Sequence, residues 1–403
     1  MIRVNKKIVT DIALNIVAIL MPTAVLQLLV LPACTAGLGS AEYGLMTTFL
    51  ALFNLIPGTF GIAINNIRLI YDEKYKQLGL CGDFNLLLVG LLAIAAVLTI
   101  MATAFFGVSS VVGLLVIIAT AVLWLLREYI TVEFRISLNY RYIFVSNALV
   151  AAGYILGYLV SALTDVWEFV FLFGQVLCWP YLVSRTKLME EPLHKTPLLG
   201  TVTRETTLFS LAAFLSRGVS YSDRLILYPM LGGHVVSVYY VSSLAGKMLS
   251  MFVSPLSTVL LSYLAKSSKK SQKAFTTSLF TGSLACLIAF VAIALSAEPI
   301  LSVLYPTLVN EAMPYVYITS GSSLIYALAS LLNTHVLKFY SMTWQIKINL
   351  IIFVVYVLCS IGLFIPFGLY GFCFGSLLAN CLKLVVTISI FFYKNADSKS
   401  VRG

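Results

Sequence analysis

Charged residues are scarce in this chain, at 10% of 403 residues, and only three are histidines. A water-soluble domain of this length cannot cover its apolar surface with so few charges, so a soluble protein is excluded. The motifs of soluble catalysis are missing as well. The sequence has no His-Glu-x-x-His, no Gly-x-Ser-x-Gly and no glycine-rich fingerprint, and Gly246-Lys247 lacks the rest of a P-loop.

Paired cysteines are also missing. The seven cysteines are odd in number and scattered, with no Cys-x-x-Cys pair, and the three histidines are far apart in the sequence. We therefore expect the cysteines to act as small packing residues, with no disulfide framework, no metal site and no cofactor.

Apolar residues are abundant. They make up 60% of the chain, mean hydropathy is +0.98, and they fall in continuous runs. Runs of about 20 residues match a hydrocarbon layer of about 30 Å, and continuous rather than alternating runs predict helices rather than strands. The predicted spans are 10–32, 43–70, 84–106, 109–130, 142–162, 167–184, 206–230, 234–264, 275–296, 313–337, 344–366 and 369–393.

Basic residues divide sharply between the two ends of these twelve spans. All but four of the 26 lie at the N-terminus, at the C-terminus or near every second connection. The other connections carry no basic residue and hold instead Glu42, Asp165, Glu168, Glu298 and Glu311. By the positive-inside rule, both termini are predicted to be cytoplasmic. The net charge of +10 is then explained by topology and anionic lipid, without a nucleic-acid partner.

The longest connection, residues 185–204, is polar and falls between spans six and seven. It predicts two six-helix bundles, 1–195 and 196–403, with a central cavity between them. The segments "LGSAEYG" (Leu38–Gly44) and "LGGHVVSVY" (Leu231–Tyr239) form a weak internal repeat that supports this division.

Four basic residues remain inside spans: Arg217, Arg224, Lys247 and Lys383, against one acid, Asp223. Charges at such depth are costly and usually face a watery cavity, so we expect a positively charged wall that accepts an anion. Arginine suits a phosphate because its planar fork donates two parallel bonds. In the alternative, Asp223 and Arg224 pair with neighbouring helices and the lysines extend toward the cytoplasm.

The geometry of span seven gives three further expectations. Arg217 and Arg224 are two turns apart and should share a face, whereas Asp223 points about 100° away from Arg224 and is not expected to pair with it inside the helix. Gly218 and Pro229 predict a bent or broken helix, with Pro22 in a comparable place in span one.

"YSDRLILYPMLGGHVVSVYYVSSLAGKM" (Tyr221–Met248) resembles a run found in polysaccharide exporters of the MOP superfamily, and "LGSAEYGLMTTFLALF" (Leu38–Phe53) resembles their second span. The chain is most similar to Wzx-type O-antigen or capsule flippases. The resemblance implies a non-enzymatic, MATE-like protein of the bacterial cytoplasmic membrane. It would carry undecaprenyl-diphosphate-linked oligosaccharide across by alternating access, among membrane lipids and with other polysaccharide assembly proteins as partners.

The family's cavity is lined by cations from both halves, but the first half here has no mid-span Arg or Lys. Either Arg68 or Arg127 substitutes, or the cation lining is one-sided. The sugars would meet uncharged polar groups, for which the candidates are Gln27, Asn65, Asn66, Ser220, Tyr221, Asn333 and Gln345; these side chains also serve as helix-packing hydrogen bonds.

Two other functions stay open. A multidrug or ion antiporter of the same superfamily would need carboxylates within the spans, and only Asp223 qualifies. A polysaccharide polymerase or ligase would need a large external loop with catalytic side chains, and the longest external connection, residues 297–312, has two glutamates and no basic residue.

Overall fold

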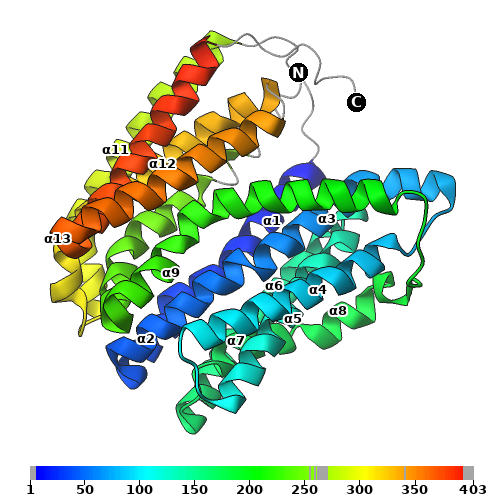
Figure 1. Ribbon diagram of the computed structural model, residues 1–403, viewed down its shortest axis with the longest axis horizontal. Coiled ribbons are helices and arrows are strands. Elements are labelled where there is room, and N and C mark those ends of the chain that lie inside the picture. Colours follow the sequence, from blue (N-terminus) through cyan, green and yellow to red (C-terminus); the bar gives the residue numbers. More distant parts are fainter. Residues whose placement is uncertain (1–5, 254–255, 258–259, 261–270, 340–341, 394–403) are drawn as a thin grey trace. The chain divides into compact units, whose positions relative to one another are not determined.

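The computed structural model describes residues 6–253, 256–257, 260, 271–339 and 342–393, with side chains from Leu14 onward except at 337–345 and 393. Nearly all of these residues are helical (Figure 1). Within these residues, eight continuous helical stretches are long and apolar enough to cross a membrane, so the chain is a multi-pass membrane protein. The elements are α1 (Lys6–Val25), the π-helical η1 (Leu26–Val30), α2 (Leu31–Leu55), α3 (Pro57–Leu78), α4 (Asp83–Phe105), α5 (Val111–Ile136), α6 (Tyr140–Thr164), α7 (Phe169–Val176), α8 (Trp179–Arg185), the 3-10 turn η2 (Leu188–Glu190), α9 (Leu199–Met251), α11 (Gln272–Leu304), α12 (Val309–Phe339) and α13 (Met342–Tyr393).

The chain forms two compact units, unit 1 (Met1–Gly233) and unit 2 (His234–Gly403). Helix α9 contributes its first segment to unit 1 and its second segment to unit 2. The division into bundles 1–195 and 196–403, which follows the polar connection, stays a prediction.

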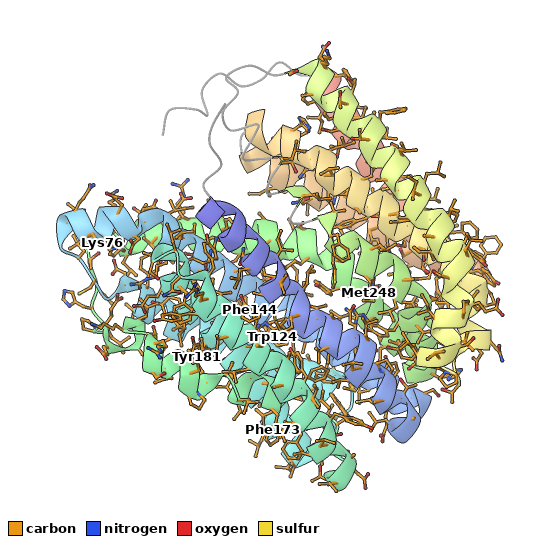
Figure 2. The ribbon with its side chains drawn as sticks, turned by 180° about the vertical axis from the view of Figure 1, so that it is seen from behind. Lys76, Trp124, Phe144, Phe173, Tyr181 and Met248 are labelled. Carbon is orange, nitrogen blue, oxygen red and sulfur yellow. The ribbon has the colours of Figure 1, made fainter. Side chains whose placement is uncertain are left out.

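Unit 1 packs α3 and α4 against α5, and α6 against α1 and α7. Its core is rich in aromatic rings. Phe53 of α2 stacks on Trp124 of α5 with ring centroids 6.0 Å apart, and it meets Phe171 of α7 edge-on at 5.5 Å. Figure 2 labels Trp124 inside this unit, and it labels Lys76 and Phe173 at opposite ends of it.

In unit 2, α12 packs against both α11 and α13. The hydroxyl of Thr319 on α12 donates to the carbonyl of Ser242, which joins α12 to the second segment of α9. A buried seam of hydroxyls and one amide runs between α12 and α13. In it Ser322 bonds Ser376 at 2.9 Å, and the Nδ2 of Asn380 donates to the Ser322 hydroxyl at 2.9 Å.

Three of the long helices contain a glycine with non-helical angles: Gly39 in α2, Gly232 in α9 and Gly368 in α13. Each lies between two of the predicted spans. In α13 the chain doubles back on itself, because a Cβ built at Gly371 or Gly375 would touch the carbonyl group of Leu363 or Cys359. The Gly-x-x-x-Gly spacing of Gly371 and Gly375 therefore serves close helix packing.

The count of twelve spans stays a prediction. The candidate span within α13 has 47 residues, which in a straight helix would run about 70 Å, more than twice the hydrocarbon thickness. The shorter apolar segment Phe169–Arg185 coincides with predicted span six, and the last residues of span eight lie outside the described residues.

The helix is not broken at Gly218, which lies buried within the helical first segment of α9. Pro229 lies inside the helix, and the break follows at Gly232. Pro22 likewise stays within α1, which then passes into the π-helical turn η1. A helix does end within predicted span two, where α2 gives way to α3 at Pro57, since proline supplies no N–H to the preceding turn.

Candidate functional site

Arg217 and Arg224 both reach from α9 to the backbone of α2. The Nη1 atom of Arg217 donates to the carbonyl of Asn54 at 2.8 Å, and that of Arg224 donates to the carbonyl of Thr47 at 3.0 Å. Thr47 and Asn54 are themselves two helical turns apart, and the two helices run antiparallel. The expectation that both arginines share one face of the helix is confirmed.

The Asn54 carbonyl is available because α2 ends at Leu55. The carbonyls in the last turn of a helix have no following turn to donate to them, and a cation there is favoured by the helix dipole. Gly58 leaves room for the guanidinium, since a Cβ at Gly58 would lie 2.9 Å from Nη1 of Arg217. The helix break at Pro57 thus creates the position that Arg217 occupies.

The two arginines differ in their electrostatic partners. Arg224 is buried beside Asp223, with 3.6 Å between its Nε and the Oδ1 of the carboxylate, which also accepts the backbone N–H of Arg224. The expectation that these neighbours do not pair is wrong, because the short aspartate side chain folds back over its own backbone. Arg217 is half-buried, and among the described residues it has no carboxylate within ion-pair distance.

The two lysines lie in unit 2. The Nζ of Lys383 on α13 lies 3.8 Å from the ring centroid of Tyr326 and 3.4 Å from the hydroxyl of Ser330, both on α12. Lys383 is 5% exposed and has no carboxylate partner within the described part of the chain. Lys247 is half-buried, with its Nζ 5.5 Å from the ring centroid of Tyr239.

Two of the predicted lining residues fasten helices to each other. Asn65 donates to the carbonyl of Glu128 at 2.6 Å, and its own side-chain carbonyl accepts from Arg135. Asn66 accepts from the same Arg135 at 2.9 Å, so both amides join α3 to α5.

The other lining candidates are spread over both units. They are Ser220 and Tyr221, half-buried on α9; Gln27, half-buried on η1; Asn333, half-buried on α12; and Gln345, which lies on α13 among the side chains outside the described residues. Their role as a lining stays a prediction.

The two cytoplasmic candidates are both ion-paired. Arg127 pairs with Glu128 at 2.9 Å, beside the ring of Trp124. Arg68 of α3 pairs through both Nη atoms with Glu191, a residue of the connection between α8 and α9. Its Nη1 also donates to the hydroxyl of Tyr129 at 2.8 Å.

Sequence reasoning missed four residues that fasten this connection. They are Asp83, Asn85 and Glu133, which contact the connection from α4 and α5, and Glu191 of the connection itself. Asp83 is fully buried at the start of α4, and it accepts hydrogen bonds from Tyr75 and from Thr196. The one available signal was the acidic pair Glu190-Glu191 in a connection that otherwise carries basic residues.

Neither family models nor curated protein sequences give a match to this chain. Solved structures do. A multidrug resistance MATE family transporter of the MOP superfamily, in an inward-facing conformation, aligns with a TM-score of 0.68 at 12% identity, over 94% of this chain and 98% of its own. The lipid II flippase MurJ, in an inward closed conformation, aligns with a TM-score of 0.72 at 14% identity, over 94% of this chain and 85% of its own.

The chain has the fold of MATE transporters and MurJ. The all-α, MATE-like architecture expected from the sequence is confirmed in this respect. A MOP superfamily transporter from Pyrococcus furiosus, described as having a binding pocket of reversed polarity, aligns with a TM-score of 0.59 at 13% identity over 94% of this chain and 95% of its own. At such identities the shared property is the fold, and the chemistry must come from the residues of this chain.

Proposed function

We propose that this protein is a flippase that moves undecaprenyl-diphosphate-linked oligosaccharide repeat units, of an O-antigen or a capsule, across a bacterial cytoplasmic membrane. The observation that carries the proposal is the positive charge of Arg217, which no carboxylate of the described residues balances. A backbone carbonyl accepts its hydrogen bond but does not neutralise it, so the guanidinium keeps a net charge and further N–H donors. A diphosphate supplies the missing negative charge and oxygen acceptors.

The mechanism follows from what the substrate needs. Its sugars and diphosphate cannot dissolve in hydrocarbon, whereas its polyprenyl tail can remain there. We propose that twelve spans in two six-helix bundles enclose a polar cavity and expose it to each side of the membrane in turn. Arg217, Arg224, Lys247 and Lys383 would hold the headgroup, and both termini would be cytoplasmic.

An antiporter for drugs or ions is the second candidate, favoured by the fold that the chain shares with MATE transporters. Its chemistry needs an acidic side chain within the spans that can exchange cations or protons. Asp223 is the acidic residue in such a place, and Arg224 lies beside it. This pairing favours the flippase. A polymerase or ligase has no comparable observation in its favour.

The test is a lipid extract from cells depleted of the protein, analysed by mass spectrometry beside staining of surface polysaccharide. We expect surface polysaccharide to fall while undecaprenyl-diphosphate carrying one complete repeat unit accumulates. Unchanged surface polysaccharide with new drug sensitivity would favour the antiporter instead.

A further inference from the structure

The connection between α8 and α9, residues 186–198 and here called the linker, is fastened to unit 1 by side chains of three helices. Glu133 of α5 accepts from the hydroxyl of Thr186 at 2.7 Å and from the backbone N–H of Lys187 at 3.0 Å. Asn85 of α4 donates to the carbonyls of Leu188 and Glu191 at 2.8 and 3.0 Å. The linker is therefore a docked segment and not a loose tether.

The turn between α3 and α4 is shaped to receive the linker. Gly82 has a positive φ of 109°, and a Cβ built on it would lie 2.7 Å from the N–H nitrogen of His194 and from the carbonyl oxygen of Pro192. Such a contact leaves no room for a side chain. Thr196 closes the docked segment, since its backbone N–H donates to the carboxylate of Asp83 at 2.7 Å.

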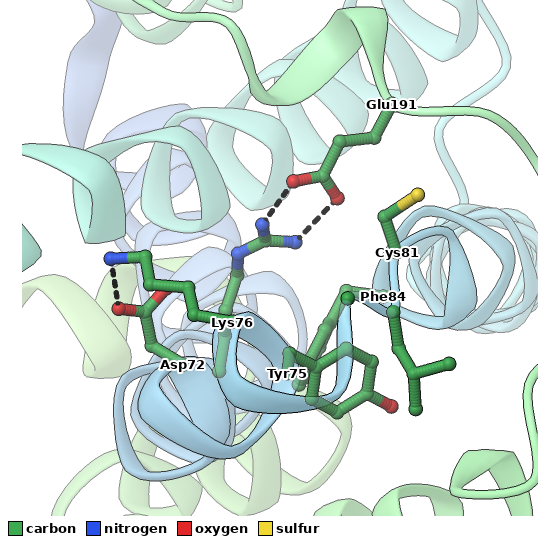
Figure 3. A pocket seen from close by; sticks show the side chains of 9 residues that line it. Asp72, Tyr75, Lys76, Cys81, Phe84 and Glu191 are labelled. Atoms are coloured by element: carbon green, nitrogen blue, oxygen red, sulfur yellow. Dashed lines mark hydrogen bonds and ion pairs between the residues drawn. The ribbon is translucent and has the colours of Figure 1, made fainter.

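Arg68 of α3 and Glu191 of the linker both line a pocket of about 160 Å³, and Figure 3 shows Glu191 in this lining. The Arg68 side chain is 9% exposed, and that of Glu191 is 24% exposed. The guanidinium is held independently of Glu191, because its Cζ lies 5.0 Å from the ring centroid of Phe84 and its Nη1 donates to Tyr129. Removing Glu191 would therefore leave a fixed, buried fork of donors facing the pocket.

We propose that this pocket is a binding site for a phosphate-type oxyanion, and that Glu191 occupies it as an exchangeable internal anion. A carboxylate and a phosphate fit the arginine fork in the same two-bond geometry. The Nε of Arg68 is buried without an acceptor in the described structure, so Glu191 does not use all the donors of this guanidinium. Lys76 also lines the pocket but is paired with Asp72 at 2.6 Å, so the positive charge for an incoming anion comes from Arg68.

Exchange of the two anions couples ligand binding to release of the linker. A buried guanidinium without an anion is strongly disfavoured, so Glu191 leaves readily only when another anion arrives. The linker joins the two predicted bundles, and its release would change the constraint between them. The proposal rests on the proposed function for the natural source of the oxyanion, a lipid-linked diphosphate; the site itself is tested without transport.

The experiment is hydrogen–deuterium exchange of the full-length protein in nanodiscs of zwitterionic lipid, read on peptides covering residues 186–198. Inorganic pyrophosphate is added at constant ionic strength, and in a second arm the nanodiscs contain undecaprenyl phosphate. We expect linker exchange to accelerate about tenfold or more, because the charge-assisted bonds to Glu191 are replaced. If pyrophosphate accelerates linker exchange, a soluble oxyanion is sufficient to replace Glu191. If only undecaprenyl phosphate does so, the pocket binds the headgroup of a lipid.

Variants distinguish replacement of Glu191 by an added anion from a permanent ion pair between Arg68 and Glu191. Arg68→Lys keeps the charge but loses the fork, so it should lose the response to added anion. In Glu191→Gln, the backbone amides of the linker should undergo rapid hydrogen–deuterium exchange without any added anion. In Glu190→Gln, which changes the exposed neighbouring residue, they should behave as in the wild type. The proposal fails if neither anion changes linker exchange in the wild type, or if Arg68→Lys responds fully. In that case, accumulation of lipid-linked repeat units in depleted cells would still support the flippase function. Conversely, a response of the linker to anions without such accumulation would support the anion site and contradict the flippase function.

Discussion

At the scale of single residues, the nature of the partner atom decides what a buried charge is available to do. Arg224 lies beside a carboxylate, whereas Arg217 donates to a carbonyl that carries only a partial charge. The same distinction separates Arg68, which shares two bonds with Glu191, from Lys383, which has an aromatic ring and a hydroxyl. Of these four cations, Arg217 and Lys383 therefore have the most capacity for an anionic ligand.

Arg217→Ala is expected to reduce export of surface polysaccharide by tenfold or more while the protein still inserts into the membrane. The substitution removes both the charge and the donor, and a charge-assisted contact of this kind corresponds to about 1.5–3 kcal/mol. Arg217→Lys, which keeps the charge without the fork, should retain part of the activity. Export is measured by surface staining, normalised to protein abundance; wild-type export by Arg217→Ala at wild-type abundance would remove Arg217 from the mechanism.

At the scale of elements, the approach of α9 to α2 depends on glycine. A Cβ built at Gly44 would lie 1.8 Å from the carbonyl oxygen of Gly233, so any side chain there must push the two helices apart. Gly37 is in the same element and has nothing within 4 Å of its Cβ position. The pair therefore offers a matched test of whether this packing holds Arg217 and Arg224 against α2.

Gly44→Ala should destabilise unit 1 by about 1–3 kcal/mol, as overpacking does elsewhere, whereas Gly37→Ala should be close to neutral. The measurement is the thermal unfolding midpoint of the purified protein in detergent, with ligand-free samples at equal concentration. Equal midpoints for the two variants would show that α9 does not pack on α2 as described.

Helix positions were predictable because apolar runs of membrane length and the glycines between them are local signals. The breaks at Gly39, Gly232 and Gly368 accordingly fall where the predicted spans meet. The break at Pro57 was not predictable, since proline is often accommodated within membrane helices. Docking of the linker was missed for a different reason, because the contact of Arg68 with Glu191 joins residues far apart in the sequence.

At the scale of the whole molecule, the distribution of basic residues predicts which ends of the helices face the cytoplasm. Cys81 is exposed in the turn after α3, on the side predicted to be cytoplasmic, and Ser109 is exposed between α4 and α5, on the side predicted to be external. A membrane-impermeant maleimide applied to intact spheroplasts should label Ser109→Cys but not Cys81. Cys81 should react only after permeabilisation, and labelling of Cys81 from outside would invert the topology.

Transport of a lipid-linked diphosphate can be measured with the purified, reconstituted protein. Purified protein is placed in liposomes with a fluorescent undecaprenyl-diphosphate-linked oligosaccharide, and a membrane-impermeant quencher reports the leaflet that each molecule occupies. We expect the wild-type protein to move the lipid between leaflets and Arg217→Ala, reconstituted in equal amount, to do so at least tenfold more slowly. Equal movement in liposomes with the wild-type protein, with the variant and with no protein would contradict this expectation.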